Sequence, residues 1–333
     1  MIFFRRLLCS LLLLSACLRA PAIEKIARTP YVGAIVTDAA TGGVLFEDNA
    51  DARGYPASVT KLMTFAIVTD RVASGQLTLE TPVTVSAEAA KIGGSQVYLK
   101  QGEVFTVDEL LTALLVPSAN DAAVALALHV AGSRAEFVEL MNAKARALGM
   151  ASSVFHSPHG LPPGAGQQPD VSTARDLAVL SRELVRQQSV LRYSSVKVRM
   201  LREKSASPFE MRNHNNLLGR LAGCDGLKTG YFAAAGSSIA VTAERNGRRV
   251  VAVVLSSEGS KNRDLKAMEL VEKGFAALGP VAAGVDTRAA PTRPAPAENI
   301  PVVKTGGPAP QVPASTLADS PIKFTLPSAT KSK

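Results

Sequence analysis

A serine and a lysine three residues apart could carry nucleophilic chemistry in this chain of 333 residues. Ser58 and Lys61 lie in the stretch PASVTK, where a run of apolar residues at three- and four-residue spacing begins. Positions i and i+3 share one face of a helix, so the serine Oγ and the lysine Nζ can meet. In a dry site near other cations the pKa of a lysine falls, and its free amine can then take the serine proton. A helix-capping serine and a surface lysine would give the same letters, so both interpretations stay open.

A second polar pair lies between two apolar segments. Ser118 and Asn120 occur in LLVPSANDAAVALA, directly after Pro117. The proline predicts the end of one helix, and Asn120 with Asp121 predicts a cap on the next. Such a turn would direct Ser118 and Asn120 into a cleft. A plain connection between two helices would have the same sequence pattern, so both interpretations stay open.

The tripeptide Lys-Thr-Gly occurs twice. The copy at Lys304 stands among prolines and a glycine pair, which exclude a central strand. The copy that begins at Lys228 precedes two β-rich runs separated by Asn246-Gly247, a pair typical of a tight hairpin turn. We therefore assign any chemistry to Lys228, Thr229 and Gly230.

The elements that must position these residues follow a simple order. β-rich runs with a hairpin turn between them occur near both ends, at residues 32–48 and 236–257. The segments between them have helical periodicity, and a last helical segment follows residue 260. This order predicts an α+β fold, in which an antiparallel sheet is built from both chain ends and a helical cluster is inserted between them.

The three motifs in this order are the trio of serine β-lactamases and penicillin-binding proteins. With NADARGYPASVTKLMT, FHSPHGL, STARDLA and GCDGLKTGYFAAAGSS, the chain closely resembles the low-molecular-mass D-alanyl-D-alanine carboxypeptidases. These are serine peptidases that trim peptidoglycan stem peptides. The resemblance covers residues 27–278 and implies one peptidase domain of the β-lactamase/transpeptidase-like fold.

The resemblance also implies catalytic roles for four residues. Ser58 would be the nucleophile that forms an acyl-enzyme, and Lys61 would be its general base. Ser118 would relay a proton toward the leaving D-alanine. Asn120 would orient Lys61 and hydrogen-bond the substrate peptide.

Substrate binding is implied for five further residues. Lys228 would supply positive charge, and Thr229 would donate to the substrate carboxylate. Gly230 would leave room for the peptide along the strand edge. The backbone N–H of Tyr231 would complete an oxyanion hole with that of Ser58, and the forked donors of Arg263 would bind the terminal carboxylate.

The implied activity is that of a D-alanyl-D-alanine carboxypeptidase, acylated by penicillin and acting without a cofactor. An endopeptidase that cuts D-alanyl cross-links is the main alternative, and a β-lactamase or a non-catalytic wall-binding protein are others. No H-E-x-x-H or comparable cluster suggests a metal site. His159 and His214 are expected to order loops.

The ends of the chain differ in character from the rest. Residues 1–22 combine Arg5 and Arg6 with a short apolar run, which predicts an export signal and a location in the periplasm or cell envelope. The sequence is compatible both with cleavage after Ala22 and with lipidation of Cys17. A lipidated Cys17 is the one membrane attachment that we expect. Residues 279–333 are rich in proline and alanine, which predicts a disordered tail. The net charge of +9 is dispersed, so nucleic-acid binding is not expected.

Overall fold

The computed structural model describes residues 23–279. The predicted export signal, including Cys17, and all of the predicted tail after Gly279 lie outside these residues. The strands are β1 (Gly33–Asp38), β2 (Val44–Asp48), β3 (Pro82–Thr84), β4 (Val104–Thr106), β5 (Val198–Leu201), β6 (Phe209–Arg212), β7 (Cys224–Phe232), β8 (Gly236–Arg245) and β9 (Arg248–Ser257). The helices are the 3-10 turn η1 (Ala57–Thr60), α1 (Lys61–Ala73), α2 (Ala87–Ala90), α3 (Val107–Leu115), α4 (Asn120–Ala131), α5 (Arg134–Ala147), α6 (Ala174–Arg186), α7 (Leu191–Ser194) and α8 (Ser260–Leu278).

The main sheet joins the two ends of the described chain, as predicted. Its strand order is β2-β1-β9-β8-β7, and every neighbouring pair is antiparallel. The β8–β9 hairpin turns at Asn246 and Gly247, which both have positive φ, so the expected Asn-Gly turn is confirmed. The predicted α+β class is thereby confirmed.

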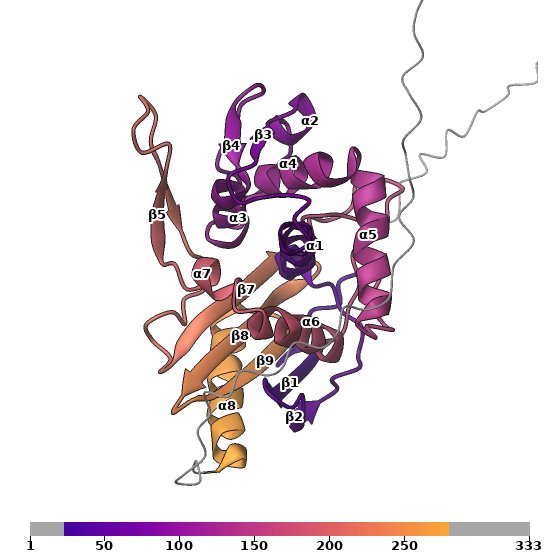
Figure 1. The fold of residues 1–333 in the computed structure, drawn as a ribbon. Helices are drawn as coiled ribbons and strands as arrows, with labels where there is room; N and C mark the ends of the chain where they lie inside the picture. The colour runs from indigo at the N-terminus through magenta and orange to yellow at the C-terminus, as the bar shows by residue number, and fades with distance from the viewer. Residues whose placement is uncertain (1–22, 280–333) are drawn as a thin grey trace, which may run out of the picture. The chain divides into compact units, whose positions relative to one another are not determined.

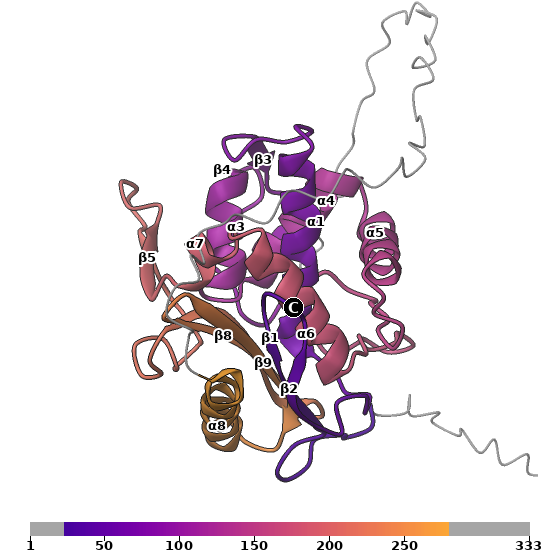
Figure 2. The same cartoon turned by 60° about the horizontal axis from the view of Figure 1, so that its bottom comes forward.

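Both faces of the main sheet are buried. Because successive side chains of a strand point to opposite faces, alternate residues of one strand pack in different cores. Along β9, Val250, Ala252 and Val254 pack in the core that includes Leu270 of α8. The intervening β9 side chains, Val251, Val253 and Leu255, pack in the larger core formed with the helices that precede the sheet in sequence. Figures 1 and 2 show α8 on one face and α6 with α1 on the other. The catalytic motifs belong to the side of the sheet that α6 and α1 cover.

Two small antiparallel pairs were not anticipated from sequence. β3 pairs with β4, and β5 pairs with β6, in strands of three or four residues. Strands this short give no usable alternation of polar and apolar residues. Within residues 23–279, no helix combines the length and the apolar composition needed to span a bilayer.

Candidate active site

Ser58 lies in the 3-10 turn η1, which directly precedes α1, and α1 begins at Lys61. The preceding Ala57 has φ +50°, an uncommon conformation for a residue with a side chain. Gly160 fits directly against this turn, because a Cβ there would lie 1.9 Å from the Ala57 carbonyl oxygen. With the turn held in this way, Lys61 Nζ lies 3.0 Å from Ser58 Oγ. The structure therefore brings together the two residues that the sequence pairs.

Lys61 is fully buried and has three polar neighbours. Its Nζ donates to Asn120 Oδ1 at 2.7 Å and to the His159 carbonyl at 2.7 Å. Both acceptors lack a proton of their own, so in the neutral amine they would use its two N–H groups, and its lone pair would be left for Ser58 Oγ. Burial, followed by the charge of Lys228, holds the pKa of Lys61 well below its ordinary value. A free amine in reach of a hydroxyl is the geometry of a general base.

Asn120 and Asp121 do not cap α4, so that prediction was wrong. The N-cap of α4 is Ala119, without a side-chain hydrogen bond. The Asn120 amide is committed to Lys61 on one side and donates to the Gly93 carbonyl at 2.7 Å on the other. The Asp121 carboxylate accepts from backbone N–H groups of the segment 97–99 and from that of Ala122 in the first turn of α4. Asn120 thus fixes the rim of the site, and Asp121 ties that rim to the start of the helix.

Ser118 is buried, and its Oγ has no hydrogen-bond partner among the residues that the structure describes. Its φ of +63° is unusual for serine and marks the turn between α3 and α4. A buried polar atom without a partner costs free energy unless something else uses it. The hydroxyl is therefore available to a group that enters the site.

The Lys-Thr-Gly segment lies on β7, one of the two edge strands of the main sheet. A Cβ on Gly230 would lie 2.5 Å from the Pro56 carbonyl oxygen and 2.9 Å from the Ser58 nitrogen. Glycine is thus required for β7 to pack on η1. This packing is a second reason for a glycine here, besides the predicted role of leaving room for a peptide. The contact also brings the strand that carries Lys228 and Thr229 against the turn that carries Ser58.

Lys228 is 2% exposed and donates to the Thr229 carbonyl at 2.8 Å. Burial, followed by the charge of Arg263, lowers the pKa of Lys228 to about 7. Arg263 is itself 4% exposed in the first turn of α8, and its Nε and Nη2 both donate to Asp264 Oδ1. The guanidinium is therefore near enough to act on Lys228, while its fork is engaged by a carboxylate of its own helix.

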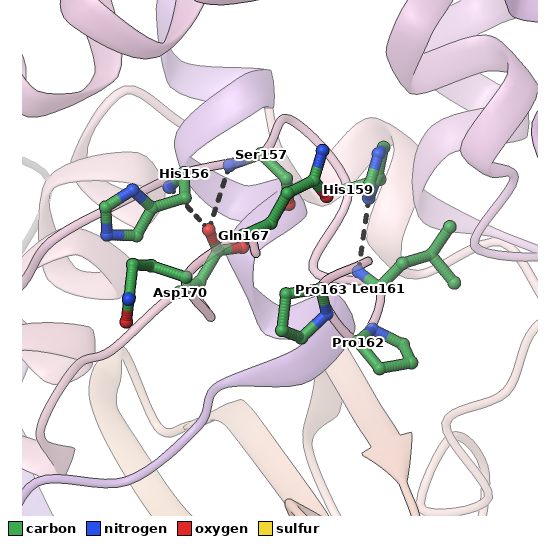
Figure 3. Close-up of a pocket in the computed structure, with 9 residues that line it drawn as sticks. His156, Ser157, His159, Leu161, Pro162, Pro163, Gln167 and Asp170 are labelled. Atoms are coloured by element: carbon green, nitrogen blue, oxygen red, sulfur yellow. Dashed lines mark hydrogen bonds between the residues drawn. The ribbon is translucent and has the colours of Figure 1, made fainter. Parts of the chain in front are cut away.

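The loop between α5 and α6 supplies contacts that the sequence motifs did not reveal (Figure 3). Asp170 is buried and accepts from the backbone N–H groups of His156 and Ser157, at 2.6 and 2.9 Å. It also accepts from the hydroxyl of Thr60, the last residue of η1, at 3.0 Å. The His159 ring accepts from Leu161 N, so it orders the loop that presents the His159 carbonyl to Lys61. A backbone acceptor has no sequence signature, although the stretch FHSPHGL marks the segment.

The combined arrangement suits acyl transfer. Among residues 23–279, it offers a hydroxyl beside a buried amine, an unpartnered hydroxyl, a second buried lysine and a sheet edge that pairs with no further strand. No group of three potential metal-binding side chains is found within residues 23–279. The features match the nucleophile, base and electrostatic components of covalent catalysis.

Comparisons with known proteins agree with this geometry. A family model described as D-alanyl-D-alanine carboxypeptidase matches residues 25–259. D-alanyl-D-alanine carboxypeptidase DacF of Bacillus subtilis is 34% identical over 242 residues, which cover 73% of this chain and 61% of the relative. DacD of Escherichia coli is 36% identical over 249 residues, covering 72% and 62%. This chain thus spans about three fifths of the length of these relatives.

A solved structure extends the similarity to the fold. Penicillin-binding protein D2 of Listeria monocytogenes, in its ampicillin-bound form, superposes with a TM-score of 0.65 at 34% identity. The match covers 74% of this chain and 97% of the Listeria chain. The predicted resemblance to the carboxypeptidase family is confirmed, as is the predicted fold.

Proposed function

Because the chain belongs to the D-alanyl-D-alanine carboxypeptidase family, we propose that it removes the terminal D-alanine of peptidoglycan stem peptides through an acyl-enzyme on Ser58. The observation that carries the proposal is the environment of Lys61. Its Nζ donates to two carbonyl oxygens, its pKa is well below the ordinary value, and it lies 3.0 Å from Ser58 Oγ, so the neutral amine can accept the serine proton.

The first step forms the acyl-enzyme. Lys61 takes the Ser58 proton as Oγ bonds to the carbonyl carbon of the penultimate D-alanine. The carbonyl oxygen becomes an oxyanion, which the N–H groups of Ser58 and Tyr231 stabilise. When the C–N bond breaks, the proton passes through Ser118 to the leaving amine. The unpartnered Ser118 hydroxyl supports this relay.

The second step returns the free protein. Water attacks the ester carbon while Lys61 accepts a water proton. The Ser58–carbon bond breaks, and the same proton passes to Ser58 Oγ.

Before the terminal D-alanine leaves, Lys228 and Thr229 hold its carboxylate, with Arg263 beside them. The terminal residue therefore lies next to the proton path.

The test uses a purified muropeptide pentapeptide and a fluorescent penicillin. We expect release of D-alanine and a label on the tryptic peptide that contains Ser58, with both lost in Ser58→Ala. Hydrolysis of cross-linked dimers without release of D-alanine would assign the chain to the endopeptidases instead. Rapid turnover of the penicillin, rather than a stable adduct, would favour a β-lactamase. Labelling unaffected by Ser58→Ala would contradict the proposed nucleophile.

Two partners follow from this proposal. Peptidoglycan is the substrate, and β-lactams act as covalent inhibitors, as the ampicillin-bound Listeria relative suggests. Both require exposure to the cell envelope, and the predicted export signal supports that location. The intact mass of the mature protein distinguishes cleavage after Ala22 from lipidation of Cys17.

A further inference from the structure

The hairpin of β5 and β6 reaches the rim of the active site through the side chain of Arg202. This residue directly follows β5, and its side chain is 12% exposed. Its Nη1 donates to the Val97 carbonyl at 3.0 Å, and its Nη2 donates to the Tyr98 carbonyl at 3.1 Å. Its Nε and Nη2 also donate to the Glu103 carboxylate, at 3.1 and 2.6 Å. All three guanidinium nitrogens are therefore bound to the chain around residue 100.

The two carbonyls belong to residues 93–99, which we call the rim segment. Around Val97 and Leu99 it belongs to no helix or strand, yet both of these side chains are buried. Tyr98 between them has φ +56°, which a bulky residue rarely adopts without support. The Asp121 carboxylate accepts from the N–H groups of Val97 and Leu99, at 3.1 and 3.0 Å. An arginine thus binds the carbonyls of the segment and a carboxylate its N–H groups, which satisfies backbone that no ladder pairs.

Asn120 depends on the rim segment for two of its hydrogen bonds. Its backbone N–H donates to the Ser95 carbonyl at 2.7 Å, and its Nδ2 donates to the Gly93 carbonyl at 2.7 Å. Gly94 lies so close that a Cβ there would be 2.6 Å from Asn120 Nδ2. With Nδ2 fixed in this way, Oδ1 accepts from Lys61 at 2.7 Å. A continuous path of backbone and hydrogen bonds therefore leads from the hairpin to the catalytic lysine.

We propose that Arg202 is a positioning residue for the reaction: by holding the rim segment, it keeps the Asn120 amide against Lys61 and keeps Lys61 buried. Arginine suits this task because its planar fork binds two neighbouring carbonyls and a carboxylate at once, which a lysine ammonium does not reproduce. The inference rests on the proposed function, in which Lys61 is the general base for Ser58.

The first test measures the protonation of Lys61 and needs no substrate. Arg202→Ala should let the rim segment move and admit water, so the pKa of Lys61 should rise toward its ordinary value. The ¹³Cε signal of Lys61, followed by NMR in protein labelled at lysine, measures this pKa, and Lys61→Arg identifies the signal. The substitution leaves in place every charged or titratable group that acts on or feels Lys61: Lys228, Asp121, Asp170, His159 and His214.

The second test measures the rate of acylation by a fluorescent penicillin. We expect Arg202→Ala to react about tenfold more slowly. This is less than the loss of about 100-fold that a displacement of about 1 Å can cause, because Asp121 still holds the other side of the segment. Ethylguanidinium in solution should restore part of the rate, since it can take the place of the lost fork. The acidic limb of kcat/KM for D-alanine release should move to higher pH together with the pKa of Lys61.

A second variant separates the side chain from the backbone. Arg202 has φ +55°, which glycine adopts without strain, so Arg202→Gly removes the fork and keeps the turn. It should have the same effects as Arg202→Ala. Arg212→Ala is the matched control, because Arg212 lies on the same hairpin, is 72% exposed and pairs with Glu210. It should leave both the Lys61 titration and the acylation rate unchanged.

Three outcomes decide between the possible roles of Arg202. An unchanged Lys61 pKa in Arg202→Gly, or acylation of this variant at the normal rate, would overturn the proposal. A lower thermal midpoint without either effect would make Arg202 a purely structural residue. If the unaltered protein neither reacts with penicillin nor releases D-alanine, the proposed function fails instead, and the titration of Lys61 still decides whether Arg202 positions it.

Discussion

At the scale of single residues, the site depends on keeping two buried lysines in different protonation states. Lys61 must be neutral to accept the Ser58 proton, whereas Lys228 must be charged to hold a carboxylate. Burial, and next the charge of Lys228, lowers the pKa of Lys61, whereas burial and the charge of Arg263 lower the pKa of Lys228 to about 7. Different charged neighbours can thus separate the pKa values of two buried lysines.

The dependence of activity on pH follows from these two groups. As pH rises, kcat/KM should first increase while Lys61 loses its proton. It should then decrease as Lys228 loses its charge near its pKa of about 7. Lys228→Arg keeps the charge at every accessible pH, so the decrease on the basic side should disappear while the acidic side remains. The measurement is kcat/KM from about pH 5 to about pH 10. A basic limb that persists in Lys228→Arg would assign it to another group.

At the scale of elements, the nucleophile turn and the edge strand depend on each other. η1 precedes α1, β7 belongs to the sheet, and at Gly230 the backbone of β7 packs against that of η1. The clash that a Cβ would cause there involves backbone atoms, which cannot swing aside as a flexible side chain does. The position of Ser58 is therefore set by a strand more than 160 residues later in the chain.

Gly230→Ala should separate η1 from β7 without unfolding the core. A displacement of about 1 Å at a catalytic group can cost about 100-fold in rate, so acylation by penicillin should slow by about that factor. Gly259→Ala is the control, since a Cβ there would meet nothing within 4 Å. Stopped-flow acylation of both variants measures the effect. Acylation of Gly230→Ala at the normal rate would contradict the predicted clash.

The loop between α5 and α6 is a second element with a positioning task. Burial raises the pKa of Asp170, while its hydrogen bonds from His156, Ser157 and Thr60 oppose that rise. The carboxyl group thus serves as the common acceptor of a loop whose His159 carbonyl contacts Lys61. Asp170 therefore contributes mainly to the structure of the loop, and it affects catalysis through the position of the His159 carbonyl.

Asp170→Ala should lower the free energy of unfolding by about 3 kcal/mol, because it leaves buried N–H groups without an acceptor. It should also lower kcat, since the His159 carbonyl loses its support. Asp51→Ala provides the comparison: Asp51 is 70% exposed in its ion pair with Arg175, so the loss should stay below about 1 kcal/mol. Urea denaturation and D-alanine release measure the two effects. Equal stability of the two variants would refute the role of Asp170.

At the scale of the whole molecule, the described residues enclose two hydrophobic cores on either side of one sheet. Their buried members range from Tyr31 to Val271, so the sheet and its covering helices lie within residues 23–279. The segment after this range has half of the chain's 20 prolines, and the predicted disordered tail rests on this composition.

A chain that ends at Gly279 should therefore keep both its thermal midpoint and its rate of D-alanine release. Differential scanning calorimetry and the hydrolysis assay provide the comparison with the full chain. A midpoint lower by several degrees would show that residues 280–333 stabilise the domain, contrary to the predicted tail.

The sequence predicted the architecture well because its long elements have clear periodicity. The strands of the main sheet and the helices near them carry alternating or three-to-four spacing, and an Asn-Gly turn joins two of the strands. The short pairs β3–β4 and β5–β6 offer no such signal. Residues 120 and 121 misled the capping prediction, because a polar residue at a helix start does not reveal which way its side chain turns. The proximity of Ser58 and Lys61 followed from spacing, whereas that of Lys228 followed from resemblance.

The pairing of β1 with β9 has a temporal consequence. A chain made from its N-terminus presents Ser58 and Lys61 early, yet the strand that positions Ser58 and lowers the pKa of Lys61 emerges far later. Until residues near 257 have been synthesised, β1 has β2 as a partner but lacks β9, and we expect Lys61 to stay solvated and protonated. In the proposed mechanism the nascent chain is therefore chemically silent, and activity arises only when synthesis of the sheet is complete.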